Sequence, residues 1–265
     1  MMRFEIVDRV AVLTLDRQER RNALNAEICD EIRAHFMSVA GVGGERVNGV
    51  GAIVIAAEGS AFCAGADLAR RAADTADGGG IQPGGNDSFR PSFERLLYCI
   101  VEHPLPVFAA INGPCMGAGM QLAVGCDFRV ASPKAIFSIP ASKLGIVLSA
   151  ANIARLSRLV GPSMSRDLLL ASRSLNVDEA ESAGLVNRRA DDVRDFTIAW
   201  ADEVARLAPI TVHGHKRALH LIETGLSQDG IAELKALEET AFMSSDLQEG
   251  LDAFAQKRPP EFTGK

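Results

Sequence analysis

The stretch from Val107 to Asp127, VFAAINGPCMGAGMQLAVGCD, constrains the fold more than any other part of the sequence. It opens with a short apolar run rich in β-forming residues, Val107–Ile111, which Asn112-Gly113-Pro114 ends in a sharp turn. The small residues 117–119 then lead into an apolar, helix-like segment that closes at Gly125. We therefore predict a buried strand that passes through a glycine-rich turn into a mostly buried helix.

The start of this helix is a candidate site for an anion, or for an oxygen that becomes negative. The first amides of a helix have no intrahelical partner and lie at its positive end. The small residues at 117–119 would let a ligand approach those amides closely. A second interpretation has equal weight at this point, because the glycines can instead serve only the close packing of the helix on the sheet.

The rest of the chain repeats strand, turn and helix units, which predicts an α/β fold. The first half predicts a hairpin of strands 4–7 and 11–15, a helix from 26 to about 40 capped by Asn25, and a strand at 51–57. The predicted later strands are 128–131, 135–137 and 185–187. The predicted later helices are 92–101, 150–160, 162–171 and 177–183.

Two changes of composition suggest how the chain is divided. Residues 70–91 are rich in Ala, Asp, Gly and Pro, which predicts a mobile surface loop beside the bound ligand. From Val193 onward the pattern is helical, with breaks near Pro209, Gly225 and Ser245. We assign residues 1–195 to an α/β core domain and residues 196–265 to a helical C-terminal region, to which the family resemblance described below gives an oligomerisation role.

Charge and cysteine usage exclude several classes of protein. A net charge of −6 argues against a nucleic-acid partner. The sequence shows no secretory signal and no apolar run of the roughly 18 residues that a membrane span needs. The five cysteines form no CxxC pair and no spacing typical of a metal site. We expect no metal, no disulfide and a reducing, cytoplasmic location.

Four motifs, read together, resemble one family. They are RRNALN at 20–25, FCAGADL at 62–68, INGPCMGAGMQLA at 111–123, and EGLDAF at 249–254 followed by Lys257-Arg258. Their order and spacing resemble the crotonase superfamily, also called enoyl-CoA hydratase/isomerase. The resemblance covers nearly the whole chain.

The resemblance implies a fold, an assembly and a ligand. The fold would be an α/β, ClpP-like spiral of ββα units with a helical C-terminal trimerisation region, assembled as a homotrimer or a dimer of trimers. The ligand would be an acyl-CoA thioester, and no cofactor is expected. Two backbone amides, carried over to Ala66 and Ala118, would form an oxyanion hole for the thioester oxygen. Preorganised donors of this kind suit an oxygen on which charge develops.

The resemblance also places a pocket for coenzyme A. For Arg20 the alternative interpretation is a solvated loop charge. Lys257 would point towards a phosphate of coenzyme A. The residues implied are Arg20, Ala23, Ala64, Asp67, Leu68, Phe254 and Lys257.

The sequence departs from the family at the two catalytic positions. Hydratases use two glutamates to hold and activate water, and here Gln121 and Ala141 stand at those positions. A glutamine side chain does not exchange a proton near neutral pH, and alanine offers no polar group. A positioned acid or base contributes typically about 10²–10⁴-fold. The sequence therefore resembles a branch of the family that lacks both glutamates.

Other groups near the motifs favour simpler interpretations. Ser149 stands where one dehalogenase branch places a nucleophilic aspartate, but an N-cap role is more consistent with a serine lacking a base. His213 and His215 suit a surface or an interface. Cys63 and Cys115 lack a basic neighbour that would lower the thiol pKa, so both suit the core.

Two functional hypotheses follow. In the first, the protein binds or delivers fatty acyl-CoA in lipid metabolism, with an oxyanion hole but without hydratase activity. In the second, it is an enzyme with a non-standard acid or base, such as an isomerase, a thioesterase or a hydratase. Turnover of a panel of acyl-CoA thioesters would distinguish them.

Overall fold

The chain begins with a β-hairpin, and the computed structural model describes residues 2–41, 45–68 and 88–265. In the hairpin, β1 (Met2–Val7) pairs antiparallel with β2 (Val10–Leu15). Every residue of β2 is buried, because this strand also pairs in parallel with β3 (Ala52–Ala57). The predicted hairpin is therefore confirmed.

A six-stranded sheet forms the centre of the molecule, in the order β1-β2-β3-β4-β6-β9. All pairs after the opening hairpin are parallel. The continuous apolar runs of β3 and β4 are typical of parallel strands that are covered on both faces. The remaining strands of this sheet are β4 (Val107–Ile111), β6 (Phe128–Ala131) and β9 (Arg188–Arg189).

A second sheet of three short strands has the order β5-β7-β8. Its strands β5 and β7 pair in parallel, whereas β7 and β8 are antiparallel. Strand β5 lies in the chain between β4 and the next helix. The three-stranded sheet therefore holds in place the turn that follows β4 of the six-stranded sheet. Its strands are β5 (Cys115–Met116), β7 (Ile136–Ser138) and β8 (Ser174–Asn176).

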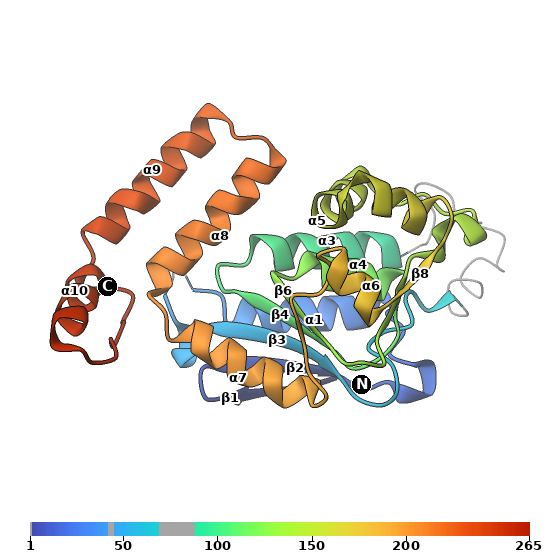
Figure 1. Ribbon diagram of the computed structural model, residues 1–265, viewed down its shortest axis with the longest axis horizontal. Helices are drawn as coiled ribbons and strands as arrows, with labels where there is room; N and C mark the ends of the chain where they lie inside the picture. Colours follow the sequence, from blue (N-terminus) through green and yellow to red (C-terminus); the bar gives the residue numbers. More distant parts are fainter. Residues whose placement is uncertain (1, 42–44, 69–87) are drawn as a thin grey trace.

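Helices cover both faces of the large sheet (Figure 1). Helices α1, α3 and α4 pack on one face, in a core that includes Leu13, Ile55 and Ile111. Helix α7 packs on the other face, against Val54 and Phe108. The bounds of these helices are α1 (Ala26–Ser38), α3 (Phe89–Glu102), α4 (Ala118–Gly125) and α7 (Val193–Ala205).

Local signals explain where several helices begin and break. The Asn25 side chain caps α1 by accepting a hydrogen bond from the amide of Ile28. Gly161, with a φ of 75°, interrupts α5 immediately before a proline, which separates the two helices predicted there. The remaining elements of the core are α5 (Ala150–Leu169), α6 (Val177–Ser182) and three 3-10 helices, η1 (Gln18–Arg20), η2 (Val47–Gly49) and η3 (Pro140–Leu144).

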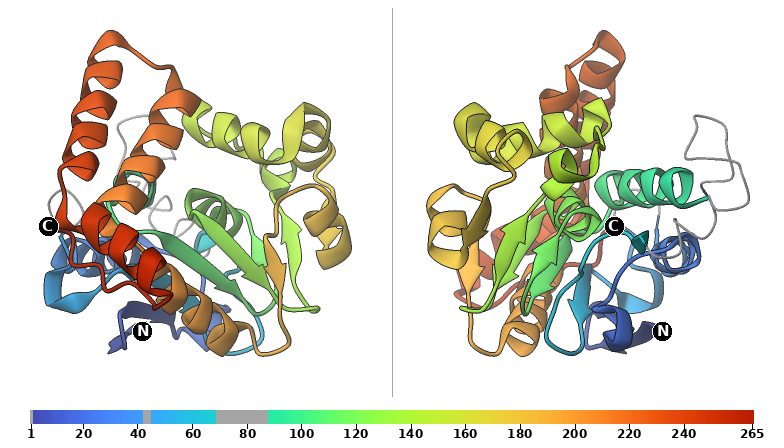
Figure 2. Two further views of the ribbon diagram at one scale, coloured as in Figure 1. Left: turned by 60° about the vertical axis from the view of Figure 1, so that its left-hand side comes forward. Right: turned by 90° about the vertical axis from the view of Figure 1, so that its right-hand side faces the viewer.

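The last three helices form a C-terminal arm that projects from the body of the molecule (Figures 1 and 2). The Lys216 ammonium joins the arm to the core by donating to Asp127 Oδ2 at 2.7 Å and to the Leu105 carbonyl at 2.9 Å. Arg46 donates to the Phe262 carbonyl at 3.0 Å and so holds the chain end. The arm consists of α8 (Pro209–Thr224), α9 (Gln228–Phe242) and α10 (Ser245–Gln256).

Arg129 is a buried cation at the C-terminal end of α4. Its side chain is 3% exposed, and it donates to the carbonyls of Ala123 at 3.2 Å and Cys126 at 2.7 Å. It also donates to the Leu185 carbonyl at 2.7 Å. A cation at this end of a helix offsets its negative pole and hydrogen-bonds its terminal carbonyls. Arg129 therefore holds the C-terminal end of α4 in place.

Several sequence-based assignments of secondary structure differ from the structure. The strand predicted at 185–187 is wrong, since pairing with β6 occurs at Arg188–Arg189. Strand β8 was not expected. Helix α3 begins at Phe89, so the predicted loop 70–91 ends earlier, and its residues 70–87 lie outside the described residues. The division proposed at 195/196 falls inside α7, which packs on the large sheet.

None of the helices within the described ranges combines the length and the apolar character that crossing a bilayer requires.

Candidate functional site

The site lies where the turns that follow β3 and β4 meet. These two strands are parallel neighbours, so their carboxyl ends reach the same edge of the sheet. The Met116 amide donates to the Cys63 carbonyl at 2.9 Å, and the Cys63 amide donates to the Pro114 carbonyl at 3.2 Å. The structure therefore joins the motifs at 62–68 and 111–123, which the sequence placed far apart.

Glycines allow the two backbones to come this close. Gly65 has a φ of 105° and Gly117 a φ of 53°, a region that favours glycine. A Cβ on Gly65 would stand 3.1 Å from the Met116 carbonyl oxygen and 3.6 Å from the Ala118 nitrogen. A Cβ on Gly119 would stand only 2.5 Å from Cys63 Cβ. Gly119 thus serves close packing, while Gly65 and Gly117 shape the two turns.

The amides of Ala66 and Ala118 are positioned beside this contact. Ala66 directly follows Gly65, and Ala118 is the first residue of α4. Within the described part of the chain, neither N–H donates a hydrogen bond to a protein acceptor. Both residues lie next to the contact between the two turns, which places two available donors at one edge of the sheet.

The motif at 20–25 runs alongside the first turn. The Leu24 amide donates to the Gly65 carbonyl at 2.8 Å, and the Asp67 amide donates to the Leu24 carbonyl at 2.8 Å. Ala23 is buried, whereas Arg20 and Ala64 are exposed. Leu68 is 46% exposed. The five residues predicted from these two motifs to contact coenzyme A are thus adjacent, and their contact with a ligand stays a prediction.

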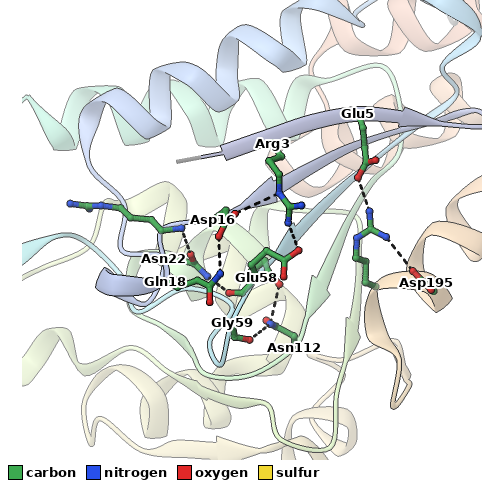
Figure 3. Close-up of polar contacts among 12 residues, drawn as sticks. Arg3, Glu5, Asp16, Gln18, Asn22, Glu58, Gly59, Asn112 and Asp195 are labelled. Carbon is green, nitrogen blue, oxygen red and sulfur yellow. Dashed lines mark hydrogen bonds and ion pairs between the residues drawn. The ribbon is translucent and has the colours of Figure 1, made fainter.

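Polar side chains that the sequence analysis missed hold this edge together (Figure 3). The Asn22 amide group donates to the carbonyls of Glu58 and Ala61, both at 2.9 Å. The Asn112 amide group likewise donates to the carbonyls of Ala57 at 3.0 Å and Gly59 at 2.9 Å. No signal in the sequence predicted these bonds, because the backbone partners of Asn22 and Asn112 lie 36–55 residues away in the chain.

Asp67 has a supporting contact in addition to its place in the motif. It is buried, and its Oδ2 accepts a hydrogen bond from Arg17 at 2.7 Å. This ion pair fastens the turn at 62–68 to the loop that follows β2.

Gln121 and Ala141 lie on two elements that flank the second turn. Gln121 is one helical turn beyond Ala118, and its Oε1 accepts from Asn152 Nδ2 at 2.7 Å. The Gly117 amide donates to the Ser138 carbonyl at 2.8 Å, which brings the segment leading to Ala141 beside the turn. Ala141 is partly buried in η3 and packs against the core. Neither position offers a carboxyl group.

A family model described as enoyl-CoA hydratase/isomerase matches residues 5–265. The chain belongs to this family. A protein of Mycobacterium tuberculosis named "Probable enoyl-CoA hydratase echA6" is 39% identical over 260 residues, which is 96% of each chain. The described architecture is the crotonase fold, as two solved structures show.

Those two structures cover this chain completely. The first is an enoyl-CoA hydratase from Bacillus anthracis, 27% identical with a TM-score of 0.86 and 99% of its chain matched. The second is an enoyl-CoA hydratase/carnithine racemase from Magnetospirillum magneticum, 28% identical with a TM-score of 0.86 and 96% matched.

The two cysteines near the site are unreactive because they are buried. Burial raises the pKa of the Cys63 thiol to about 12 and that of Cys115 well above its usual value. Both groups therefore stay protonated at neutral pH, and the thiolate is the reactive form. Ser149 is the N-cap residue of α5 but its side chain makes no capping hydrogen bond. His213 and His215 lie on α8, in the arm.

Phe254 and Lys257 lie at the far end of the C-terminal arm. Phe254 is on α10 and 87% exposed, and Lys257 follows the helix with a φ of 54°. The views in Figures 1 and 2 place α10 away from α4. Within one chain these two residues therefore do not reach the amides of Ala66 and Ala118.

Proposed function

We propose that this protein binds fatty acyl-CoA thioesters in lipid metabolism and does not hydrate them. The observation that carries the proposal is the pair of available backbone N–H groups, on Ala66 and Ala118, at the junction of two family motifs. Two neighbouring donors suit a thioester oxygen, and removing one such donor typically costs about 3–4 kcal/mol in enzymes that use them. The proposal requires no metal and no cofactor, and it places the protein in the cytoplasm.

The absence of a carboxyl group at positions 121 and 141 supports binding without hydration. Adding water across a double bond needs one group to take a proton and another to return it. The Gln121 carboxamide does not titrate near neutral pH, and Ala141 has no polar side-chain atom. The site can therefore polarise a thioester without activating water.

The arm supports assembly into a homotrimer or a dimer of trimers, in which a neighbouring chain would supply Phe254 and Lys257. Large apolar side chains on the arm are exposed to an extent that a monomer rarely shows. They include Leu219, Ile222, Phe242, Met243, Leu251 and Phe254.

Deleting one donor tests the oxyanion hole. Ala118 is the first residue of α4, where proline is well tolerated because its missing N–H has no helical partner. Ala118→Pro should therefore leave the fold intact and lower acyl-CoA affinity about 2- to 12-fold, since one net hydrogen bond to a neutral carbonyl contributes about 0.5–1.5 kcal/mol. Ala118→Gly keeps the N–H and is the matched control. Equal affinity of Ala118→Pro and wild type by calorimetry would contradict the proposal.

Turnover tests the second half of the proposal. Enoyl-, 3-hydroxyacyl- and saturated acyl-CoA thioesters are incubated with the protein, and products are identified by mass spectrometry. We expect binding without hydration, isomerisation or thioester hydrolysis. Hydration at the rate of an active family member would refute it.

A further inference from the structure

Three polar side chains form a chain of hydrogen bonds that leads to the site. Arg155 donates through a guanidinium nitrogen to Asn152 Oδ1 at 2.8 Å. Asn152 Nδ2 in turn donates to Gln121 Oε1 at 2.7 Å. A guanidinium has donors only, so the Asn152 oxygen must face Arg155 and its nitrogen must face Gln121. The direction of both bonds is thus fixed by chemistry.

This direction determines which end of the Gln121 side chain is available. Its oxygen accepts from Asn152 and therefore points towards α5, while both N–H bonds of Nε2 keep their hydrogens for another acceptor. In the described ranges Nε2 donates to no protein acceptor, and it is not among the buried polar atoms that lack a partner. The group is therefore accessible, and it presents a donor. Asn152 is only 8% exposed, which holds the arrangement in place.

Helix geometry places this donor beside the predicted oxyanion hole. Gln121 is three residues beyond Ala118, a rise of about 4.5 Å along the axis. Long helical side chains lean towards the N-terminus of their helix, over the preceding turn. This geometry would bring the Gln121 carboxamide near the first carbons of an acyl chain whose thioester oxygen accepts from the Ala118 amide.

We infer that the site selects acyl-CoA thioesters carrying an oxygen on carbon 3, with Gln121 Nε2 donating a hydrogen bond to that oxygen. Asn152 and Arg155 act as positioning residues, because they hold the carboxamide with its donor end towards the ligand. A 3-oxo group accepts only, and a 3-hydroxy group accepts or donates, so both match the donor. A saturated chain leaves the donor without a partner. The inference rests on the proposed function.

The first experiment compares saturated, 3-hydroxy and 3-oxo acyl-CoA thioesters of one chain length by calorimetry. Wild type should bind the two oxygenated ligands about 2- to 12-fold more tightly than the saturated one, the range for one net hydrogen bond. Gln121→Met replaces the carboxamide with an apolar group of similar length. It should abolish the difference between the ligands, because no side-chain donor then remains at position 121.

The second experiment reverses the direction of the hydrogen bond between residues 152 and 121. In Asn152→Asp the new carboxylate only accepts hydrogen bonds, so it receives one from Arg155 and one from Gln121 Nε2. The carboxamide must then turn its oxygen towards the ligand. The variant should lose the preference for the 3-oxo ligand and keep that for the 3-hydroxy ligand, which can donate. Thermal unfolding of both variants checks that they fold.

The outcomes separate the two claims. Equal affinity of wild type for all three ligands, or a preference that survives Gln121→Met, would overturn the inference and leave the proposed function standing. Failure of wild type to bind any acyl-CoA would instead overturn the proposed function itself.

Discussion

The substitution Gly119→Ala tests whether close contact between the two turns maintains the site. The added Cβ would stand 2.5 Å from Cys63 Cβ and 2.7 Å from the Cys63 carbonyl oxygen. These atoms are not the flexible end of a side chain but the base of a buried residue. Nonbonded carbon atoms prefer about 3.5–4.0 Å. The turn at 62–68 and the start of α4 must therefore separate by about 1 Å.

The expected cost has two parts. Overpacking of this kind destabilises a fold by typically 1–3 kcal/mol, whereas replacing a helical glycine by alanine returns about 1 kcal/mol. The net loss of up to about 2 kcal/mol corresponds to a fall in Tm of at most several degrees in a chain of this size. Separating Ala66 from Ala118 also spoils their joint geometry, so acyl-CoA affinity should fall about 2- to 12-fold, as for one lost hydrogen bond.

Gly125→Ala is the matched control, since it introduces the same methyl group in the same helix. Its Cβ would meet Leu97 at 3.4 Å, an ordinary contact. We expect a neutral or slightly stabilising effect and unchanged affinity. Thermal unfolding and calorimetric titration with one acyl-CoA measure both quantities. If Gly119→Ala matched the control in Tm and affinity, the contact between the turns would not be what positions the two amides.

Four further predictions concern other parts of the molecule. Gln121→Glu alone should not restore hydration, whereas adding Ala141→Glu should raise it modestly in an assay with enoyl-CoA, because a pair of carboxyl groups can take and return a proton; a full rate from the single variant would contradict this. His103 accepts a hydrogen bond from the Leu105 amide at 3.1 Å, and burial lowers its pKa to about 4, from 6.5. Above pH 6.5 the His103 imidazole is neutral in both the folded and the unfolded chain. Below pH 6.5 the unfolded chain binds a proton that the folded chain excludes, so the free energy of unfolding should fall by about 3 kcal/mol towards pH 4. Denaturant unfolding of His103→Gln should show a shallower pH dependence than that of wild type. Arg129→Met removes the side-chain donor from the carbonyls of Leu185 and Cys126, and one of two donors from the carbonyl of Ala123. It should lower the free energy of unfolding by at least about 2 kcal/mol, and an unchanged denaturation midpoint would disprove the role assigned to Arg129. Light scattering at micromolar concentration should report a trimer or hexamer, and a stable monomer with full acyl-CoA affinity would rule out a pocket completed between chains.

Sequence patterns predicted the elements with strong local signals. Strand β4 begins and ends at the predicted residues, because a short apolar run is followed by Asn-Gly-Pro, which cannot continue a strand. Helix α1 begins where Asn25 caps it. By contrast, Leu185 and Val186 are buried without being a strand, and the pairing falls on two exposed arginines, 188 and 189. An edge strand of two residues has no periodicity to detect.

The same limit applies to the site. The family resemblance implied that the motifs at 62–68 and 111–123 share one site, and the backbone hydrogen bonds of Cys63 show that the two motifs are in contact. The bond between Gln121 and Asn152 had no counterpart in the sequence, because it joins side chains of two helices 31 residues apart. The pairing of these two side-chain carboxamides follows from the packing of α4 and α5, which the sequence pattern does not show.

The donors at Ala66 and Ala118 belong to the main chain, and this has a consequence for how such a protein can change over generations. Among the encoded residues, only proline lacks the backbone N–H, so almost any replacement of either alanine keeps the donor as long as the turns hold. Glycines 65, 117 and 119 are the vulnerable positions instead, since their geometry admits no side chain without strain. Substitutions at positions such as 121 and 141 leave these main-chain donors unchanged, so they can alter the reaction without altering the binding of the carbonyl. Binding of a carbonyl group by the main chain can therefore be conserved while the side chains that determine the reaction change.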